Sequence, residues 1–340
     1  MVDVSFLPGG GRKIPEKGFF MKKTIFSRLI KASTLAFYRE GRRTRGYSFW
    51  HWIHGYIYAR WPYLYIRIGT GELPLLKWVR PIFMKLVYRF CLGGGKAKGS
   101  ESPPNRLSRH FADTYHGKVV PLKEAENLVS IDCDVDIVNL EKVIPYSSAR
   151  DIILRNPEHI VVLECPCRTA RSHPCQPLDV CLIIGDPMAA FVEEHHPRKA
   201  RRISCKEAIR ILHDEHARGH VHHAFFKDAM LNRFYAICNC CSCCCGAVQA
   251  HRCGTPMLAS SGFVAAVDDP VCQKCGHCVT VCVFDAIQLD DDGLKICSET
   301  CMGCGVCVDQ CTSGALSLRS APERGQPLEI MKLLEKNHVV

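Results

Sequence analysis

Eight cysteines near the C-terminus occur in two copies of one spacing. The first copy has the pattern C-x2-C-x2-C-x3-C from Cys272 to Cys282, and the second repeats it 29 residues later, from Cys301 to Cys311. The similarity continues beyond the cysteines, because DAIQL at 285–289 corresponds to GALSL at 314–318. Clustered thiolates bind metal ions or metal clusters. The repeat therefore predicts two equivalent metal sites in one small module.

This duplicated pattern resembles the bacterial-type dicluster ferredoxin module, over about residues 266–320. In that module, three cysteines of one copy and the fourth cysteine of the other hold each 4Fe–4S cluster. The resemblance implies two ligand sets, namely Cys272, Cys275, Cys278 and Cys311, and Cys301, Cys304, Cys307 and Cys282. Val283 and Thr312 stand where the family usually has proline, which removes no ligand. Zinc is the alternative, because it also binds C-x2-C pairs.

Ten more cysteines lie in the middle of the chain, around HIVVLEC at 159–165 and ICNCCSCCCGAV at 237–248. We predict that all ten are metal ligands: Cys165, Cys167, Cys175, Cys181, Cys238, Cys240, Cys241, Cys243, Cys244 and Cys245. Because four thiolates suffice for one 4Fe–4S cluster, we expect at least one further iron–sulfur cluster here. Zinc and redox-active thiols are the alternatives. In an extended chain, side-chain alternation would place Cys241, Cys243 and Cys245 on one side, and Cys240 and Cys244 on the other.

Arginines and histidines surround these middle cysteines. We expect Arg168 and Arg171 to lower the pKa of neighbouring thiols through their positive charge. Five histidines that would suit zinc crowd one segment: His213, His216, His220, His222 and His223. We nevertheless expect these histidines to be solvent-exposed. The isolated cysteines are expected to be structural: Cys91, Cys133, Cys205 and Cys297.

Strands and helices alternate in the segment that positions these cysteines. Apolar runs at 159–165, 180–185 and 233–238 predict three strands. Ser204 and Glu207 have capping-box spacing and predict the start of a helix between two of the strands. This alternation is typical of βαβ units and predicts a small, partly parallel sheet. Because the carboxyl ends of parallel strands meet at one edge of a sheet, we expect both cysteine groups at that edge.

Residues 110–320 as a whole resemble a family of uncharacterised 4Fe–4S dicluster proteins found in anaerobic microbes. The resemblance is carried by YHGKVVPLKEAENLV at 115–129, by the region from VIPYSSARDIIL to ECPCR at 143–168, and by the region from HVHH to ICNCCSCCCG at 220–246. The family is described only as iron–sulfur binding. It therefore implies cofactors but no reaction.

Positive charge is concentrated in the first third of the chain. Residues 1–110 contain 21 Lys and Arg against 5 Asp and Glu, whereas the rest of the chain has a formal charge of −6. Amphipathic basic helices are predicted at 25–38 and 81–90, near four tryptophans. Such segments lie on anionic membrane surfaces, and we expect this of residues 20–92. Two alternatives are that this segment forms a helical cap on the protein's own core or binds a protein partner. Binding to nucleic acid is disfavoured, because no known nucleic-acid-binding module accompanies the basic residues.

The composition predicts an α+β protein with several parts. We expect a basic, aromatic, amphipathic helical segment (1–92), a linker (93–109), a cysteine-rich α/β domain (110–262), a dicluster ferredoxin domain (263–320) and a C-terminal tail (321–340). No window of 18 uncharged apolar residues predicts a transmembrane helix. The 23 cysteines, without a convincing secretory signal, predict a reducing cytoplasmic location, with peripheral attachment to the inner face of the membrane.

These observations predict an iron–sulfur electron-transfer protein that relays single electrons to or from a redox partner. Two other functions stay open: an iron–sulfur reductase with a catalytic cluster or thiol site within residues 165–253, and a zinc-stabilised binding or regulatory protein. No G-x-G-x-x-G motif follows a predicted strand, so no nucleotide or flavin site is indicated. An electron carrier or oxidoreductase subunit fits better than a stand-alone enzyme.

Overall fold

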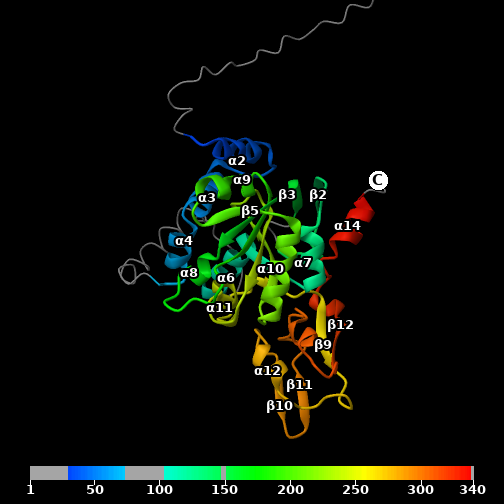
Figure 1. Ribbon diagram of the computed structural model, residues 1–340. Coiled ribbons are helices and arrows are strands. Elements are labelled where there is room, and N and C mark those ends of the chain that lie inside the picture. The colour runs from blue at the N-terminus through cyan, green and yellow to red at the C-terminus, as the bar shows by residue number, and fades with distance from the viewer. Residues whose placement is uncertain (1–29, 73–102, 147–150, 338–340) are drawn as a thin grey trace, which may run out of the picture.

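The computed structural model describes residues 30–72, 103–146 and 151–337 (Figure 1). The predicted helix at 81–90, Cys91 and most of the predicted linker lie outside these ranges. The last residues of that linker form the beginning of helix α6 (Pro103–Thr114). The predicted C-terminal tail contains the 3-10 helix η2 (Pro322–Arg324) and helix α14 (Ile330–Asn337).

A mostly antiparallel sheet of eight strands forms the centre of the protein. The strands are β1 (Tyr115–Val120), β2 (Val135–Ile137), β3 (Ile152–Glu164), β4 (Asp179–Asp186), β5 (Ala200–Ile203), β6 (Val221–Lys227), β7 (Arg233–Cys240) and β8 (Leu258–Ala259). Their order is β2-β3-β4-β7-β6-β1-β8, and β5 pairs with β3. With helices on both faces, the fold is mixed α+β.

The three strands predicted around the middle cysteines correspond to β3, β4 and β7. The predicted βαβ arrangement is wrong, because β4 pairs antiparallel with both β3 and β7. Two antiparallel steps leave β3 and β7 running in the same direction. The ends of β3 and β7 therefore lie at one edge of the sheet, where β4 begins.

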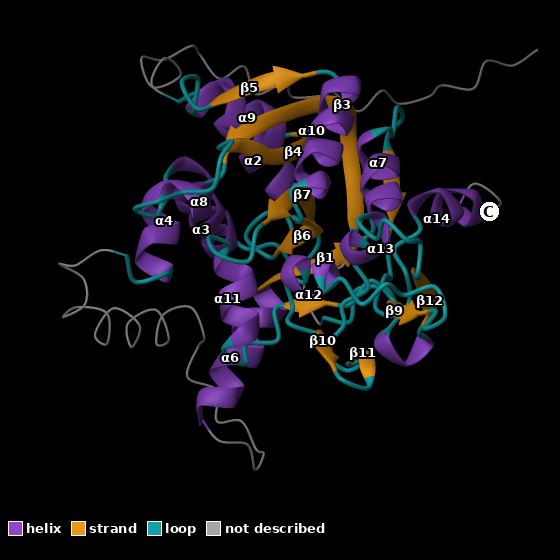
Figure 2. Cartoon of the chain, turned by 60° about the horizontal axis from the view of Figure 1, so that its bottom comes forward, coloured by secondary structure: helices purple, strands orange, loops and turns teal. Residues whose placement is uncertain are grey.

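Helices cover the two faces of this sheet (Figures 1 and 2). They are α2 (Ala32–Arg43), α3 (Phe49–Arg60), α4 (Pro62–Gly69), α7 (Leu122–Val129), α8 (Pro166–Thr169), α9 (Met188–His195), α10 (Cys205–Ala217) and α11 (Gly246–Arg252). Helices α7, α10 and α14 enclose one core with residues such as Leu128 and Leu212. Helices α2, α3, α9 and α11 enclose the other, which contains Phe37 and Phe191. Ser204 caps α10 as predicted, since its hydroxyl accepts the N–H of Glu207 at 3.2 Å.

The described N-terminal helices pack on the sheet domain. Residues 25–29 of the helix predicted at 25–38 lie outside the described ranges, and its described part overlaps α2, which begins at Ala32. Phe37 of α2 is fully buried, with its ring 5.9 Å from that of Phe191. Gly55 lets α3 approach closely, because a Cβ there would lie 2.0 Å from the carbonyl oxygen of Ala229. Residues 30–72 thus form a helical cap on the protein's own core. In the described part of the chain, no helix combines the length and hydropathy needed to cross a membrane.

The C-terminal module has a small core of its own and lies at one end of the sheet domain (Figure 1). Its elements are β9 (Phe263–Val267), α12 (His277–Val281), β10 (Ile287–Asp290), β11 (Gly293–Ile296), α13 (Val306–Asp309) and β12 (Leu316–Ser320). Strand β9 pairs with β12, and β10 pairs with β11. Helices α12 and α13 occupy equivalent places in the repeat, and each follows a glycine with positive φ, Gly276 at 74° and Gly305 at 86°. The sequence duplication is therefore also a structural one.

Candidate functional site

Cysteines from three strands meet at the sheet edge where β3 and β7 end. Cys165 directly follows β3, Cys181 lies near the start of β4, and Cys238 lies near the end of β7. Leu182 of β4 pairs with Ile237 of β7. The next position in this antiparallel register places Cys181 opposite Cys238. The sheet thus brings the two cysteine groups of the sequence together, as predicted, although by antiparallel pairing.

Six thiols form one continuous row at this edge. In order of contact, this six-cysteine chain consists of Cys238, Cys181, Cys165, Cys167, Cys245 and Cys240. Each thiol affects the pKa of the next, and the sulfur atoms of Cys245 and Cys240 lie 3.1 Å apart. Helix α11 begins beside the row, since a Cβ at Gly246 would lie in ordinary van der Waals contact with the sulfur of Cys167, at 3.8 Å. The row lies largely out of solvent.

Five thiols of this row have raised pKa values: Cys165, Cys167, Cys181, Cys240 and Cys245. Hydrogen bonding to Cys167, together with burial, raises the pKa of Cys165 to about 12. The contact with Cys165 and burial also raise the pKa of Cys181 well above its ordinary value. The lowering expected from Arg168 is therefore not found at Cys165. Such buried thiols ionise readily only when a bound cation compensates their charge.

Arg168 is instead engaged by groups other than the thiols. It is paired with Glu215, and both side chains are 1% exposed. The guanidinium also donates to the carbonyl oxygens of Pro177 and Asn239, at 2.5 and 3.2 Å. Its Nε–H is buried and has no hydrogen-bond acceptor among the residues that the structure describes. The positive charge of Arg168, which lies near Cys165, is therefore paired with the carboxylate of Glu215.

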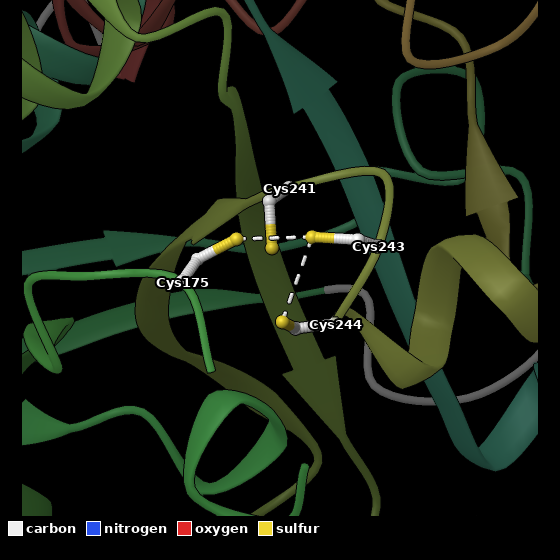
Figure 3. A group of neighbouring side chains, drawn as sticks. All are labelled: Cys175, Cys241, Cys243 and Cys244. Carbon is white, nitrogen blue, oxygen red and sulfur yellow. Dashed lines mark hydrogen bonds between the residues drawn. The ribbon is translucent and has the colours of Figure 1, made fainter. Parts of the chain in front are cut away.

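Four other cysteines form a compact four-cysteine group: Cys175, Cys241, Cys243 and Cys244 (Figure 3). Their sulfur atoms all lie within 4.8 Å of one another. The sulfur of Cys243 lies 2.9 Å from that of Cys175 and 3.6 Å from that of Cys244. Cys241 and Cys244 are buried, whereas Cys243 is exposed. Four thiols at this spacing can hold a metal ion.

A turn decides which thiols belong to which group. Strand β7 ends at Cys240, and residues 242–244 form a turn before α11. The expected alternation along an extended chain is therefore wrong. The turn directs three thiols toward Cys175 and leaves Cys240 and Cys245 in the six-cysteine chain. As predicted, some thiols of this stretch combine with cysteines that follow β3.

Two polar side chains hold this turn in place. Gln249 donates its amide to the carbonyl oxygen of Cys243 at 2.8 Å. Arg171 donates from Nε and Nη2 to the carbonyl oxygen of Cys244, both at 3.4 Å. Arg171 also pairs with Glu72, which follows α4. The arginine expected to act on thiol charge thus fixes the backbone that carries the thiols.

A cavity of about 2550 Å³ borders the six-cysteine chain, and all six of its residues line it. On its wall, the hydroxyl of Tyr58 lies 2.9 Å from that of Tyr235 and 3.3 Å from that of Tyr115. The ammonium of Lys227 lies 4.5 Å from the ring centroid of Tyr115, and burial lowers the pKa of Lys227 to about 8. Sequence reasoning missed this group. The aromatic pattern around Tyr58 indicated a membrane interface and carried no sign that it faces cysteines.

A row of side chains, buried except at the exposed Asp309, links the C-terminal module to the end of β7. His216 Nε2 lies 2.8 Å from a carboxylate oxygen of Asp309, which lies in α13 between two repeat cysteines. His216 Nδ1 lies 3.2 Å from Nε2 of His222. His222 Nδ1 lies 2.6 Å from the side-chain oxygen of Asn239, which separates Cys238 from Cys240. Burial lowers the pKa of His222 to about 3, so this imidazole is neutral at physiological pH.

The expectation that the crowded histidines are solvent-exposed is wrong for three of them. His216, His222 and His223 are buried, whereas His213 is exposed. The sequence contained a signal for this, since His222 and His223 lie in a run that β6 buries at every position. Asp309 and Asn239 carried no comparable signal.

Six of the eight repeat cysteines lie in or against the core of the C-terminal module: Cys272, Cys278, Cys282, Cys301, Cys307 and Cys311. Burial raises the pKa of Cys304 in the second copy to about 12, and the charge of Cys282 from the first copy acts in the same direction. Backbone N–H groups donate to sulfur from Ala286 to Cys282 at 3.3 Å and from Ala265 to Cys301 at 3.4 Å. The placement of Cys282 agrees with the ligand sets that the resemblance implies.

Three of the isolated cysteines lie away from both groups. Cys133 and Cys297 are exposed, and the sulfur of Cys205 lies 3.7 Å from the hydroxyl of Ser130. Their predicted structural role remains a prediction.

No known protein-family model matches the chain, and no curated protein matches it. The resemblances drawn from the sequence therefore rest on its motifs alone. The structure by itself supports a cysteine-rich protein with a site that can hold a metal ion.

Proposed function

We propose that this protein is an iron–sulfur electron-transfer protein that relays single electrons to or from a redox partner in the cytoplasm. Bound 4Fe–4S clusters would supply one-electron oxidation and reduction. The observation that carries the proposal is the duplicated cysteine spacing, which the equivalent helices α12 and α13 repeat in the structure. The residues of the chain supply thiolates, donate backbone N–H groups to them and exclude water.

The spacing of the sulfur atoms separates two kinds of site. A tetrahedral zinc–thiolate site has sulfur atoms about 3.8 Å apart, because the Zn–S distance is about 2.3 Å. The four-cysteine group is near this spacing. Among the described residues, the repeat cysteines do not form such a compact group, and cubane ligands stand further apart because each binds a different iron. These spacings favour a single ion such as zinc at the four-cysteine group, and clusters in the repeat.

Contacts between the module and the sheet domain support a shared redox role. Gln310 of the module donates to the carbonyl oxygen of His216 at 3.1 Å. Arg252 of α11 donates to the carbonyl oxygen of Val283, next to Cys282, at 2.7 Å. Together with the row from Asp309 to Asn239, these contacts hold the repeat cysteines against the domain that carries the middle cysteines.

A reductase is the second candidate, and the cavity favours it. An electron carrier needs no internal space for a substrate, whereas this cavity adjoins six thiols, three tyrosine hydroxyls and Lys227. Phenol and ammonium groups can donate the protons that accompany reduction of a substrate.

The exposed face of the N-terminal helices supports a further proposal, attachment to an anionic membrane surface. Phe49, Trp50 and Trp61 remain exposed after the helices dock on the core. Aromatic side chains on a basic segment suit the boundary between lipid headgroups and water.

To test the proposed function, the protein is purified anaerobically. Its iron, zinc and acid-labile sulfide contents are measured, and its clusters are observed by low-temperature paramagnetic resonance. We expect about eight irons and eight sulfides from the repeat, with the signal of interacting clusters after dithionite reduction. Cys275→Ser and Cys304→Ser should each disturb one cluster, and Cys297→Ser, at an exposed position between the copies, should disturb neither. Stoichiometric zinc in the repeat, insensitive to dithionite, would overturn the proposal.

A further inference from the structure

The ten middle cysteines divide into two sets that share no thiol. The four-cysteine group combines Cys175 with the turn after β7. The six-cysteine chain combines Cys165, Cys167 and Cys181 with the end of β7 and the start of α11. The adjacent residues Cys240 and Cys241 belong to different sets, because β7 ends between them. This edge of the sheet therefore offers two sites.

The two sites differ in the space beside their sulfur atoms. In the four-cysteine group the sulfurs point toward one another and lie within 4.8 Å, which leaves room for one ion (Figure 3). The six-cysteine chain is an open row along the wall of a cavity of about 2550 Å³. A cubane needs room for four irons and four sulfides beside its thiolates, and all six residues of the row border this open space.

Arg168 gives a second, independent indication of a ligand at the row. Its side chain is 1% exposed and lines the same cavity. Glu215 and two carbonyl oxygens engage its Nη atoms, while its buried Nε–H has no acceptor in the described part of the chain. Buried donors rarely remain without a partner. A sulfide or thiolate of a bound cluster is an acceptor of the kind this donor lacks.

We infer that the six-cysteine chain holds an iron–sulfur cluster of its own, which occupies the adjoining cavity and is separate from the ion of the four-cysteine group. Four of its six thiols suffice as ligands of a 4Fe–4S cluster. The inference rests on the proposed function in one respect, namely that the chain receives iron–sulfur clusters at all.

The full-length chain, reconstituted anaerobically with iron and sulfide, tests this inference. We expect about twelve irons and twelve sulfides in wild type, of which the repeat holds about eight. The double variant Cys165→Ala/Cys181→Ala should lose about four of each. Cys175→Ala/Cys243→Ala should lose one metal ion and keep all the sulfide, and Cys205→Ala, outside both sets, should lose nothing. Each double variant should keep the metal of the other cysteine set, which shows that the sheet domain is still folded.

Two results would overturn the inference. One is a wild type that takes up no sulfide beyond the share of the repeat. The other is a Cys165→Ala/Cys181→Ala variant with unchanged sulfide. Failure of the proposed function is recognised separately. In that case the sulfide content per chain would not change with Cys275→Ser or Cys304→Ser. A loss of sulfide with Cys165→Ala/Cys181→Ala would still support the cluster in that case.

Discussion

Lys118 shows how a single buried charge joins two parts of the protein. It lies in β1, is 1% exposed, and donates its ammonium to the carbonyl oxygen of Gln326 at 2.8 Å. Burial lowers the pKa of Lys118 to about 7. Near neutral pH this residue therefore carries its proton only part of the time, which makes the stability of the protein depend on pH.

We expect Lys118→Met to remove this dependence. Lysine in the unfolded chain titrates near pH 10.4. Between about pH 7 and pH 10 the unfolded state therefore holds a proton that the folded state has lost, and the free energy of unfolding of wild type rises with pH. The free energy of unfolding is measured with urea from about pH 6 to pH 9. Over this range the value for wild type should rise relative to that of the variant by up to about 1.4 kcal/mol per pH unit. Lys123→Met, at an exposed lysine, is the control, and parallel curves for wild type and Lys118→Met would contradict the prediction.

At the scale of elements, the two copies of the repeat differ in how closely they approach other segments. Gly303 and Lys274 occupy equivalent positions and both have positive φ, 62° and 52°. A Cβ at position 303 would lie 2.2 Å from the carbonyl oxygen of Phe263 and 2.4 Å from the hydroxyl of Ser261. Lys274 is exposed. The second loop therefore requires glycine for close contact with β9 as well as for its conformation.

We expect Gly303→Ala to destabilise the module far more than Lys274→Gly does. The alanine adds left-handed strain and a clash with backbone, which together cost at least about 2 kcal/mol, whereas the glycine relieves strain at an open position. Thermal unfolding and iron content per chain measure the difference. Similar losses in the two variants would show that the approach of this loop to β9 is unimportant.

At the scale of the whole molecule, charge and exposed aromatic groups lie in the same part of the chain. Residues 1–110 have a formal charge of +16. Within them, Trp50 is 74% exposed and Phe49 is 56% exposed, although the helix that carries them packs on the core. A segment that is both basic and aromatic combines the two attractions that hold proteins on anionic lipid surfaces.

We therefore predict that the full chain is retained on vesicles containing phosphatidylserine. Each basic residue near the surface contributes about 1 kcal/mol, and retention should fade with added salt. Phe49→Ser/Trp50→Ser should reduce retention several-fold, whereas Met331→Ser, at an exposed residue of α14, should not. Equal retention on neutral vesicles, or a salt-independent signal, would exclude the membrane as the partner of this face.

The sequence by itself determined the local features of this protein. The cysteine spacing identified the repeat, apolar runs located β3, β4 and β7, and Ser204 marked the start of α10. Each of these depends on residues a few positions apart, where side-chain chemistry and backbone preference act directly. The sequence also placed the middle cysteines at strand ends, which was enough to predict that they meet.

The tertiary structure alone decided how the middle cysteines are divided and what surrounds them. Strand direction depends on the whole sheet, so antiparallel pairing replaced the predicted βαβ units. The turn after Cys240 overrode the alternation of an extended chain and brought Cys243 to within 2.9 Å of Cys175, 68 residues away. The same packing buried His222 and Lys227, whose residue types alone predict exposure. Contacts between residues distant in sequence form only when the whole chain packs, and no local pattern encodes them.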